Sequence, residues 1–194
     1  MNYLAHFFLS NNNENLIIGN YIADDIKGKA YLDYPTEIQQ GILLHRKIDD
    51  FTDSHSTVEN SKALIREHQN KYTPVVMDVF YDYFLANNWT SYTEKELLAF
   101  TNNIYKVLFK NIKHLPTKSQ MRLPFMAKSN WLYNYKNISG IEKSLTGMSK
   151  RTSYTNNMNN AHHILEEKEL ELNKDFNQFF PELIAFCNSE IKTF

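Results

Sequence analysis

Only one cysteine, Cys187, occurs among the 194 residues. An internal disulfide is therefore impossible, and the composition is typical of a reducing compartment. Glycine and proline number five each and are widely spaced, so long segments are free of helix-breaking residues. Sustained period-two alternation and internal repeats are also absent. We therefore expect an all-α, single-domain, compact helical bundle that spans residues 1–194.

Targeting and membrane signals are lacking as well. The N-terminus has no basic region followed by an apolar stretch and a cleavage site, and no segment approaches the ~18 apolar residues of a membrane span. Hydrophobic residues make up 42% of the chain and aromatic residues 14%, which suits a globular protein with its own core. We expect a cytoplasmic protein with no membrane partner.

Acidic residues are missing from residues 97–141, a segment that holds seven Lys or Arg. The flanking segments are net acidic, with 8 − 14 = −6 over residues 1–96 and 6 − 8 = −2 over residues 142–194. An acid-free basic stretch of this length is typical of a surface that meets an anionic partner. The alternative is a solvated helix face whose charge is balanced by acids elsewhere in the fold.

Several motifs of catalysis are absent. There is no Gly-x-Gly-x-x-Gly and no Gly-x-x-x-x-Gly-Lys loop, which argues against enzymes that cradle a nucleotide in such loops. Gly-x-Ser-x-Gly is missing, and Cys187 has no histidine near it in sequence. Glu-x-x-His, which a helical di-iron oxidase would carry on two helices, does not occur either.

Two aspartates interrupt the most apolar segment of the chain. Every residue from Val75 to Leu85 other than Asp78 and Asp82 is aliphatic, Met or aromatic, so the expected helix is buried nearly all round. A buried ionised carboxylate costs several kcal/mol unless it is paired or binds a metal. The two acids also share one helical face, where like charges repel. A cation between them would remove both penalties, so this helix predicts a metal site.

The helix expected from Pro35 to Phe51 carries a second candidate pair. His45 and Asp49 are four residues apart, so they project from the same face and can ligate one ion. An imidazole with carboxylates suits Mn²⁺, Fe²⁺, Zn²⁺ or Mg²⁺. A structural hydrogen bond between the two residues is the alternative, and the acid-bearing helix at 75–85 shifts the preference toward a metal.

Three further residues have more than one interpretation each. Asp24 follows an apolar helix and points either inward or into solvent, and His6 lies among apolar residues as a core group, a ligand or a proton donor. Arg46 can pair with Asp50, which its spacing favours, or bind a phosphate bidentately. After the exclusions above, the chemistry that these residues can still support is metal-assisted hydrolysis.

Six short blocks, taken in order and spacing, resemble the acyl carrier protein phosphodiesterase family. The likeness covers most of the chain, and the blocks are Asn2–His6 (NYLAH), Gly19–Asp24 (GNYIAD), His45–Asp49 (HRKID), Asp78–Leu85 (DVFYDYFL) with Trp89, Trp131–Tyr135 (WLYNY) and Gly147–Arg151 (GMSKR).

The resemblance implies an HD-phosphohydrolase-like all-α enzyme that hydrolyses the phosphodiester between 4′-phosphopantetheine and the serine of holo-acyl carrier protein. It implies Mn²⁺ as the favoured metal, with Mg²⁺ or Fe²⁺ as alternatives. The adjacent His-Asp pair of the wider superfamily is absent, and His45 with Asp49 one turn later is the expected substitute.

With the resemblance, the candidate site takes a definite form. His6 is expected to donate a proton or add a ligand, and Arg46 and Arg151 to stabilise charge on the phosphoryl oxygens. Holo-acyl carrier protein is the expected partner, through the basic residues 97–141, and no nucleic-acid partner is expected. The expected metal ligands are Asp24, His45, Asp49, Asp78 and Asp82.

Two rival interpretations stay open at this point. One is an HD-like hydrolase of a nucleotide or another small phosphodiester. The other is a non-catalytic helical module that binds an acidic partner through the basic stretch.

Overall fold

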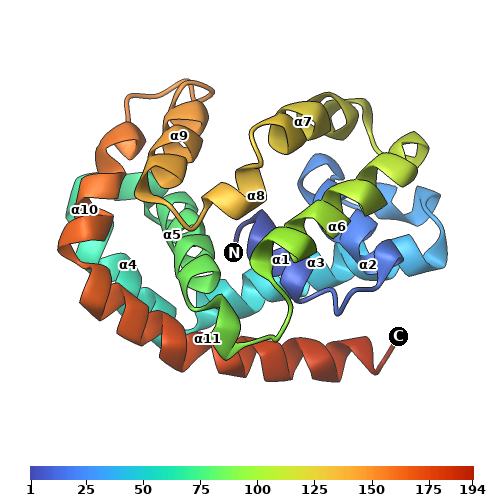
Figure 1. Ribbon diagram of the computed structural model, residues 1–194, viewed down its shortest axis with the longest axis horizontal. Coiled ribbons are helices and arrows are strands. Elements are labelled where there is room, and N and C mark those ends of the chain that lie inside the picture. The colour runs from blue at the N-terminus through green and yellow to red at the C-terminus, as the bar shows by residue number, and fades with distance from the viewer.

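The chain folds into helices joined by short loops, without a single strand (Figure 1). The computed structural model describes residues 1–194, and the expectation of an all-α fold is confirmed. The α-helices are α1 (Tyr3–Phe8), α2 (Glu14–Ile22), α3 (Thr36–Ser54), α4 (Ser56–Gln69), α5 (Thr73–Asn87), α6 (Leu97–Lys110), α7 (Thr117–Lys128), α8 (Trp131–Asn134), α9 (Ile138–Ser149), α10 (Ala161–Glu167) and α11 (Glu169–Ile191). Short 3₁₀ segments are η1 (Ala23–Asp25), η2 (Ala30–Asp33), η3 (Asn70–Tyr72), η4 (Trp89–Ser91), η5 (Ile112–His114) and η6 (Met158–Asn160).

One hydrophobic cluster of 51 buried residues holds these helices together. The longest helix, α11, runs along one side of the molecule and packs against α3 and α4 (Figure 1). It contributes Phe176 and Phe179, whose rings meet Tyr81 of α5, and Phe180, which stacks on Phe176. No helix combines the length and the hydropathy needed to cross a bilayer.

Two glycines allow α2 and α3 to cross in close contact. A side chain on Gly19 would place its Cβ 2.6 Å from the Cα of Gly41, and one on Gly41 would lie 2.8 Å from the backbone oxygen of Leu16. Larger residues would push the helices apart. This close packing brings the end of α2, with Asp24 in η1, next to His45 on α3.

The six-residue helix α1 is absent from the elements that the sequence predicts. Apart from His6 its residues are apolar or aromatic, and five of its six side chains are buried, so no amphipathic period marks it. A helix this short is not stable alone. It forms because other elements satisfy its backbone, as described below.

Two prolines, Pro124 and Pro181, lie inside helices. Pro116 and Pro124 predict a break within residues 114–124, and it lies at Leu115 and Pro116, between η5 and the start of α7 at Thr117. The helix then continues through Pro124 and ends at Lys128, beside Asn130 with its left-handed φ of 44°. Pro124 lies on the exposed side of α7, where water can satisfy the carbonyl that its missing N–H leaves free. For residues 156–191 we expected either a pair of helices or one helix bent near Pro181. They form the pair α10 and α11, which meet at Lys168, and α11 continues through Pro181.

Candidate metal site

The N-terminal end of α1 is fixed by side chains that accept its free N–H groups. Asn2 Oδ1 accepts a hydrogen bond from the backbone N–H of Tyr3 at 2.9 Å. Asp82 of α5 accepts from Leu4 at 2.8 Å and from Ala5 at 3.1 Å, one bond on each carboxylate oxygen. Burial raises the pKa of Asp82 to about 7, and the two N–H donors oppose that rise.

Asp82 therefore lies apart from the other residues predicted as ligands. Its carboxylate is fully buried and does not line the pocket that those residues share. Both of its oxygens hold α1, the helix that carries His6. In this structure the acid contributes to the site by positioning a neighbouring helix.

The ring of His6 has one nitrogen fixed by α2. His6 Nδ1 lies 3.1 Å from Asn20 Oδ1, while Asn20 Nδ2 donates to the carbonyl of Leu16 at 3.2 Å and to Ser10 Oγ at 2.9 Å. Because Asn20 donates through its nitrogen, its oxygen must accept, and His6 Nδ1 carries the proton. Burial, helped by the charge of His45, lowers the pKa of His6 to about 4, so the ring is neutral at pH 7.

The other nitrogen of His6 faces oxygen atoms. Nε2 lies 3.2 Å from the carbonyl oxygen of Met1 and 3.2 Å from Asp49 Oδ1. In the tautomer that Asn20 sets, this nitrogen bears a lone pair. A lone pair opposite two oxygens is repulsive unless a cation lies among them.

His45 stands parallel to His6 and faces two carboxylates. The two rings stack with their centroids 3.9 Å apart and an interplanar angle of 13°. His45 Nε2 lies 3.3 Å from Asp24 Oδ1 and 3.2 Å from Asp49 Oδ2. Burial lowers the pKa of His45, but hydrogen bonds to Asp24 and Asp49 outweigh it and raise the value to about 9. The two acids thus favour a positive charge at Nε2, whether a proton or a metal ion supplies it.

The carboxylates around these rings differ in exposure. Asp49 lies between both imidazoles, which hold its pKa well below the usual range although burial acts to raise it. Asp78 is half-buried, and burial raises its pKa against the opposing effect of the Met1 amino group, whose nitrogen lies 2.9 Å from its Oδ1. The Asp24 side chain is 61% exposed, and its hydrogen bond with His45 lowers its pKa.

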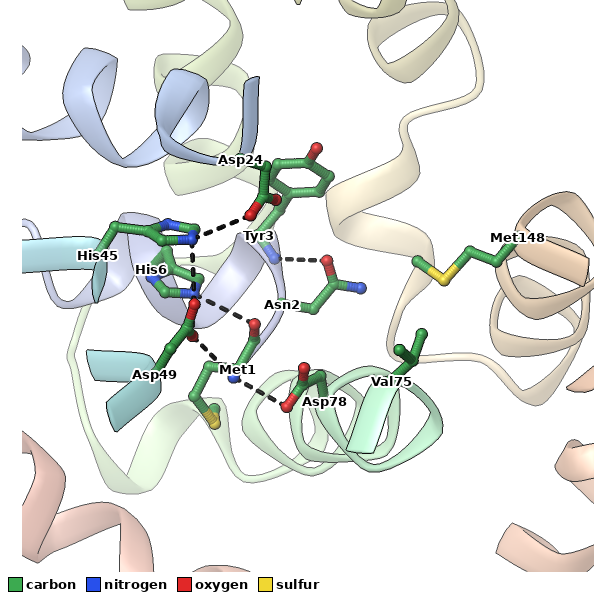
Figure 2. Close-up of a pocket in the computed structure, with 10 residues that line it drawn as sticks. All are labelled: Met1, Asn2, Tyr3, His6, Asp24, His45, Asp49, Val75, Asp78 and Met148. Atoms are coloured by element: carbon green, nitrogen blue, oxygen red, sulfur yellow. Dashed lines mark hydrogen bonds and ion pairs between the residues drawn. The ribbon is translucent and has the colours of Figure 1, made fainter. Parts of the chain in front are cut away.

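These residues line one pocket of ≈ 240 Å³ (Figure 2). The ligand atoms of His6, His45 and Asp49 all lie within 4.8 Å of one another, so the cluster is compatible with a bound metal ion. Two imidazole nitrogens with carboxylate oxygens suit a divalent ion of intermediate hardness. The fold thus brings together His6, Asp24, His45, Asp49 and Asp78 among the residues that the sequence predicts, from α1, η1, α3 and α5.

The two predicted arginines lie outside this pocket. Arg46 Nη2 donates to the carbonyls of Ile26 at 3.1 Å and Gly28 at 3.0 Å, and its guanidinium lies 5.2 Å from the centre of the Tyr31 ring. It therefore holds the loop after η1, and the favoured pairing with Asp50 does not form. Arg151 is exposed and lines a neighbouring cavity.

Two residues near the site were missed in the sequence analysis. Asn20 is a polar residue within the buried stretch 16–22. Asp78 was singled out because it is a polar residue in an apolar helix, and the same signal applies to Asn20. Arg122 has no such local signal, because it is one of seven basic residues in its segment. Its Nη2 donates to Asp25 Oδ2 at 2.6 Å and to Ser119 Oγ at 3.2 Å, and its guanidinium lies 5.5 Å from the centre of the Tyr3 ring.

Comparison with known proteins gives a consistent family match. The sequence model of a family described as acyl carrier protein phosphodiesterase matches residues 1–183. Curated proteins of that name are similar over nearly the whole chain. The relative from Photorhabdus laumondii subsp. laumondii is 28% identical over 182 residues, 93% of this chain and 92% of its own length. The relatives from Salmonella paratyphi A and Enterobacter sp. (strain 638) are 26% and 27% identical over 186 residues, 95% of this chain and 96% of their own. No solved structure matches the chain.

Proposed function

Since the chain belongs to the acyl carrier protein phosphodiesterase family, we propose that it hydrolyses the phosphodiester between 4′-phosphopantetheine and the serine of holo-acyl carrier protein. The products are the apo carrier protein and free 4′-phosphopantetheine. We further propose that the reaction depends on a divalent ion, with Mn²⁺ as the preferred metal.

The observation that carries the metal proposal is the orientation of His6. Asn20 fixes the proton on Nδ1, which leaves the lone pair of Nε2 opposite Asp49 Oδ1 and the Met1 carbonyl. Metal-binding histidines commonly donate their other ring N–H in this way to an oxygen of the protein. A cation bonded to Nε2 would turn the repulsive arrangement into a favourable one.

The proposed ligands are the histidines and aspartates that line the pocket. His6, His45 and Asp49 form the core of the metal site, and Asp24 and Asp78 add carboxylate oxygens at its edge. When bound, a divalent ion supplies a Lewis acid that activates water and neutralises charge on a phosphoryl oxygen. Asp24 is the most exposed of these acids, and its ion pair with His45 keeps its carboxylate ionised as a ligand requires.

The remaining residues position the ligands and the phosphate. Asn20 orients the His6 ring, and Asp82 fixes the helix that carries His6. Beyond the metal pocket, Arg151 supplies positive charge near the path of an anionic substrate, while Arg122 is paired with Asp25. Arg46 is bound to backbone carbonyls, and we assign it a role in holding the loop that follows Asp24.

The direct test is the mass of the carrier protein after incubation. Purified holo-acyl carrier protein is mixed with this protein and Mn²⁺, and its intact mass is followed. We expect the mass of phosphopantetheine to be lost, the loss to stop with a chelator, and added Mn²⁺ to restore it. An unchanged carrier mass, together with hydrolysis of small phosphodiesters, would contradict the proposal.

Two neighbouring acids of α3 provide a matched pair of variants. Asp49→Asn removes the carboxylate that contacts both imidazoles, and we expect it to abolish turnover while the protein stays folded. Asp50→Asn changes the adjacent exposed acid by the same chemistry and should leave turnover unchanged. Equal activity of the two variants would show that the pocket is not the active site.

A further inference from the structure

A second cavity of ≈ 650 Å³ opens directly beside the metal pocket. The two share Asn2, Tyr3, Asp24 and Met148, so they form one continuous depression. Its walls come from α7 on one side and from Met148 of α9 with Arg151 on the other, and Trp131 at the start of α8 lies between them. Figure 1 shows α7 and α9 on either side of α8. We refer to this cavity as the α7–α9 trough.

Large apolar side chains stand exposed on the α7 wall of the trough. Met121 is 67% exposed and Phe125 is 73% exposed, and both line the cavity. They are four residues apart, so they form one stripe on the same face of the helix. Adjacent exposed apolar side chains on a polar surface are typical of an interaction site, and Met and Phe are enriched in such sites.

Basic residues flank this stripe on the same helix. Lys118 lines the trough, Lys128 lies one turn beyond Phe125, and both are exposed and make no ion pair. Elsewhere in the basic segment, Lys110 of α6 pairs with Glu14 of α2 at 3.0 Å. Lys118 of α7 and Arg151 thus place unpaired positive charge on the lining of the trough.

The proposed reaction limits where a carrier protein can bind. The phosphorus atom is attached directly to a serine on the carrier surface, while a pocket of ≈ 240 Å³ is too small for a folded domain. The carrier must therefore rest on a surface continuous with the pocket mouth. The α7–α9 trough meets this requirement, and its charge is opposite to that of a small acidic protein.

We propose that the face of α7 formed by Lys118, Met121, Phe125 and Lys128 docks the acidic carrier protein, with its modified serine at the junction of trough and pocket. This inference rests on the proposed function. It narrows the partner surface from the whole basic segment to one helix. In it, Met121 and Phe125 provide the apolar contacts, and the two lysines provide steering and orientation.

The apolar contacts are tested with the double variant Met121→Ser/Phe125→Ser. Both side chains are exposed, so the fold and the Mn²⁺-dependent thermal shift should match those of the wild type. We expect KM for holo-carrier protein to rise about 10-fold or more, with kcat within about 2-fold. Leu170→Ser is the matched control, because Leu170 is 84% exposed on α11, outside the trough.

The charges are tested by reversing them singly. Lys118→Glu and Lys128→Glu should each lower kcat/KM by about 5-fold or more at low salt and weaken its dependence on ionic strength. Lys106→Glu makes the same change at an exposed lysine of α6 in the same basic segment and should have little effect. An equal loss in all three variants would overturn the proposal, because the segment would then act only through its total charge.

The outcomes separate the docking surface from the reaction. If the wild-type protein removes no phosphopantetheine, the proposed function fails and the docking proposal fails with it. If the wild type is active but the double variant keeps the KM of the Leu170→Ser control, the reaction stands and α7 is not the docking face. A raised KM with unchanged kcat, absent from the control, supports both.

Discussion

The metal pocket and the α7–α9 trough lie side by side but are built in opposite ways. The pocket consists of two buried imidazoles and the carboxylates around them, held by hydrogen bonds and ion pairs between helices. The trough presents the exposed apolar side chains of Met121 and Phe125 and the exposed basic side chains of Lys118 and Arg151, which make no ion pair. Preorganised groups suit bond cleavage, and adaptable exposed groups suit recognition of a protein surface.

This difference predicts that a single substitution in the pocket lowers activity far more than a single substitution in the trough. A buried side chain with fixed partners has no substitute when it is removed. An exposed side chain at the edge of an interface shares its role with its neighbours. The following variants test this difference in order of decreasing effect.

We expect the largest effect from His6→Gln. The amide is similar in size to the ring but cannot place a basic nitrogen beside Asp49, so the proposed metal site loses a ligand. Turnover of holo-carrier protein should fall about 10³-fold, and the Mn²⁺-dependent thermal shift should shrink. Normal Mn²⁺ binding by this variant would remove His6 from the ligand set.

Asn20→Ala should have the next largest effect. It removes the acceptor that fixes the proton on His6 Nδ1, while His6 itself remains. Loss of such an orienting partner typically weakens metal affinity by about 10- to 100-fold. Titration with Mn²⁺ measures this affinity, and excess Mn²⁺ should recover much of the activity. Failure of excess metal to restore activity would indicate a structural defect instead.

Asp82→Asn separates positioning from metal binding. The amide offers one acceptor oxygen to the two N–H groups of α1, so the unfolding free energy should fall by about 1–3 kcal/mol. Mn²⁺ affinity should change less than in the Asp49→Asn variant. Denaturant unfolding and Mn²⁺ titration provide the two measurements, and a complete loss of Mn²⁺ binding with unchanged stability would make Asp82 a ligand.

The difference in stability between the wild type and Asp82→Asn should also depend on pH. The pKa of Asp82 is raised to about 7 in the folded protein, against about 4 in an unfolded chain. The folded state therefore holds an extra proton between these values, and the contribution of Asp82 to stability falls as the pH rises from about 4 to about 7. In metal-free buffer, wild-type protein should lose stability relative to Asp82→Asn over this range. A constant difference across it would contradict the raised pKa.

The smallest of these effects is expected for Arg151→Ala. Arg151 is exposed at the trough and makes no ion pair, so we expect kcat/KM to fall only a few-fold, mainly through KM. Lys150→Ala, at the adjacent exposed residue outside the trough, is the control. A loss as large as that of His6→Gln would place Arg151 within the chemistry and blur the division between pocket and trough.

Much of the fold follows from local patterns in the sequence. Widely spaced glycines and prolines and helical periodicity predict an all-α protein, and α3 and α5 form close to where the pattern places them. Pro124 and Pro181 lie inside helices without ending them, because a proline on an exposed helix face leaves a carbonyl that water can satisfy. Local sequence does not record which side of a helix faces water in the finished fold.

For Asp78 and Asp82 the sequence predicts that a partner is needed but does not identify it. Their apolar surroundings establish that each needs a partner, since an unpaired buried carboxylate is too costly. Which partner each receives depends on α1, which lies more than 70 residues away along the chain and packs against α5. In the folded protein Asp82 accepts hydrogen bonds from the backbone of α1, whereas Asp78 lines the pocket with His6, His45 and Asp49. The sequence determined that buried charge had to be compensated, and only the packing of helices decided how, because a carboxylate is satisfied equally by N–H groups or by a cation.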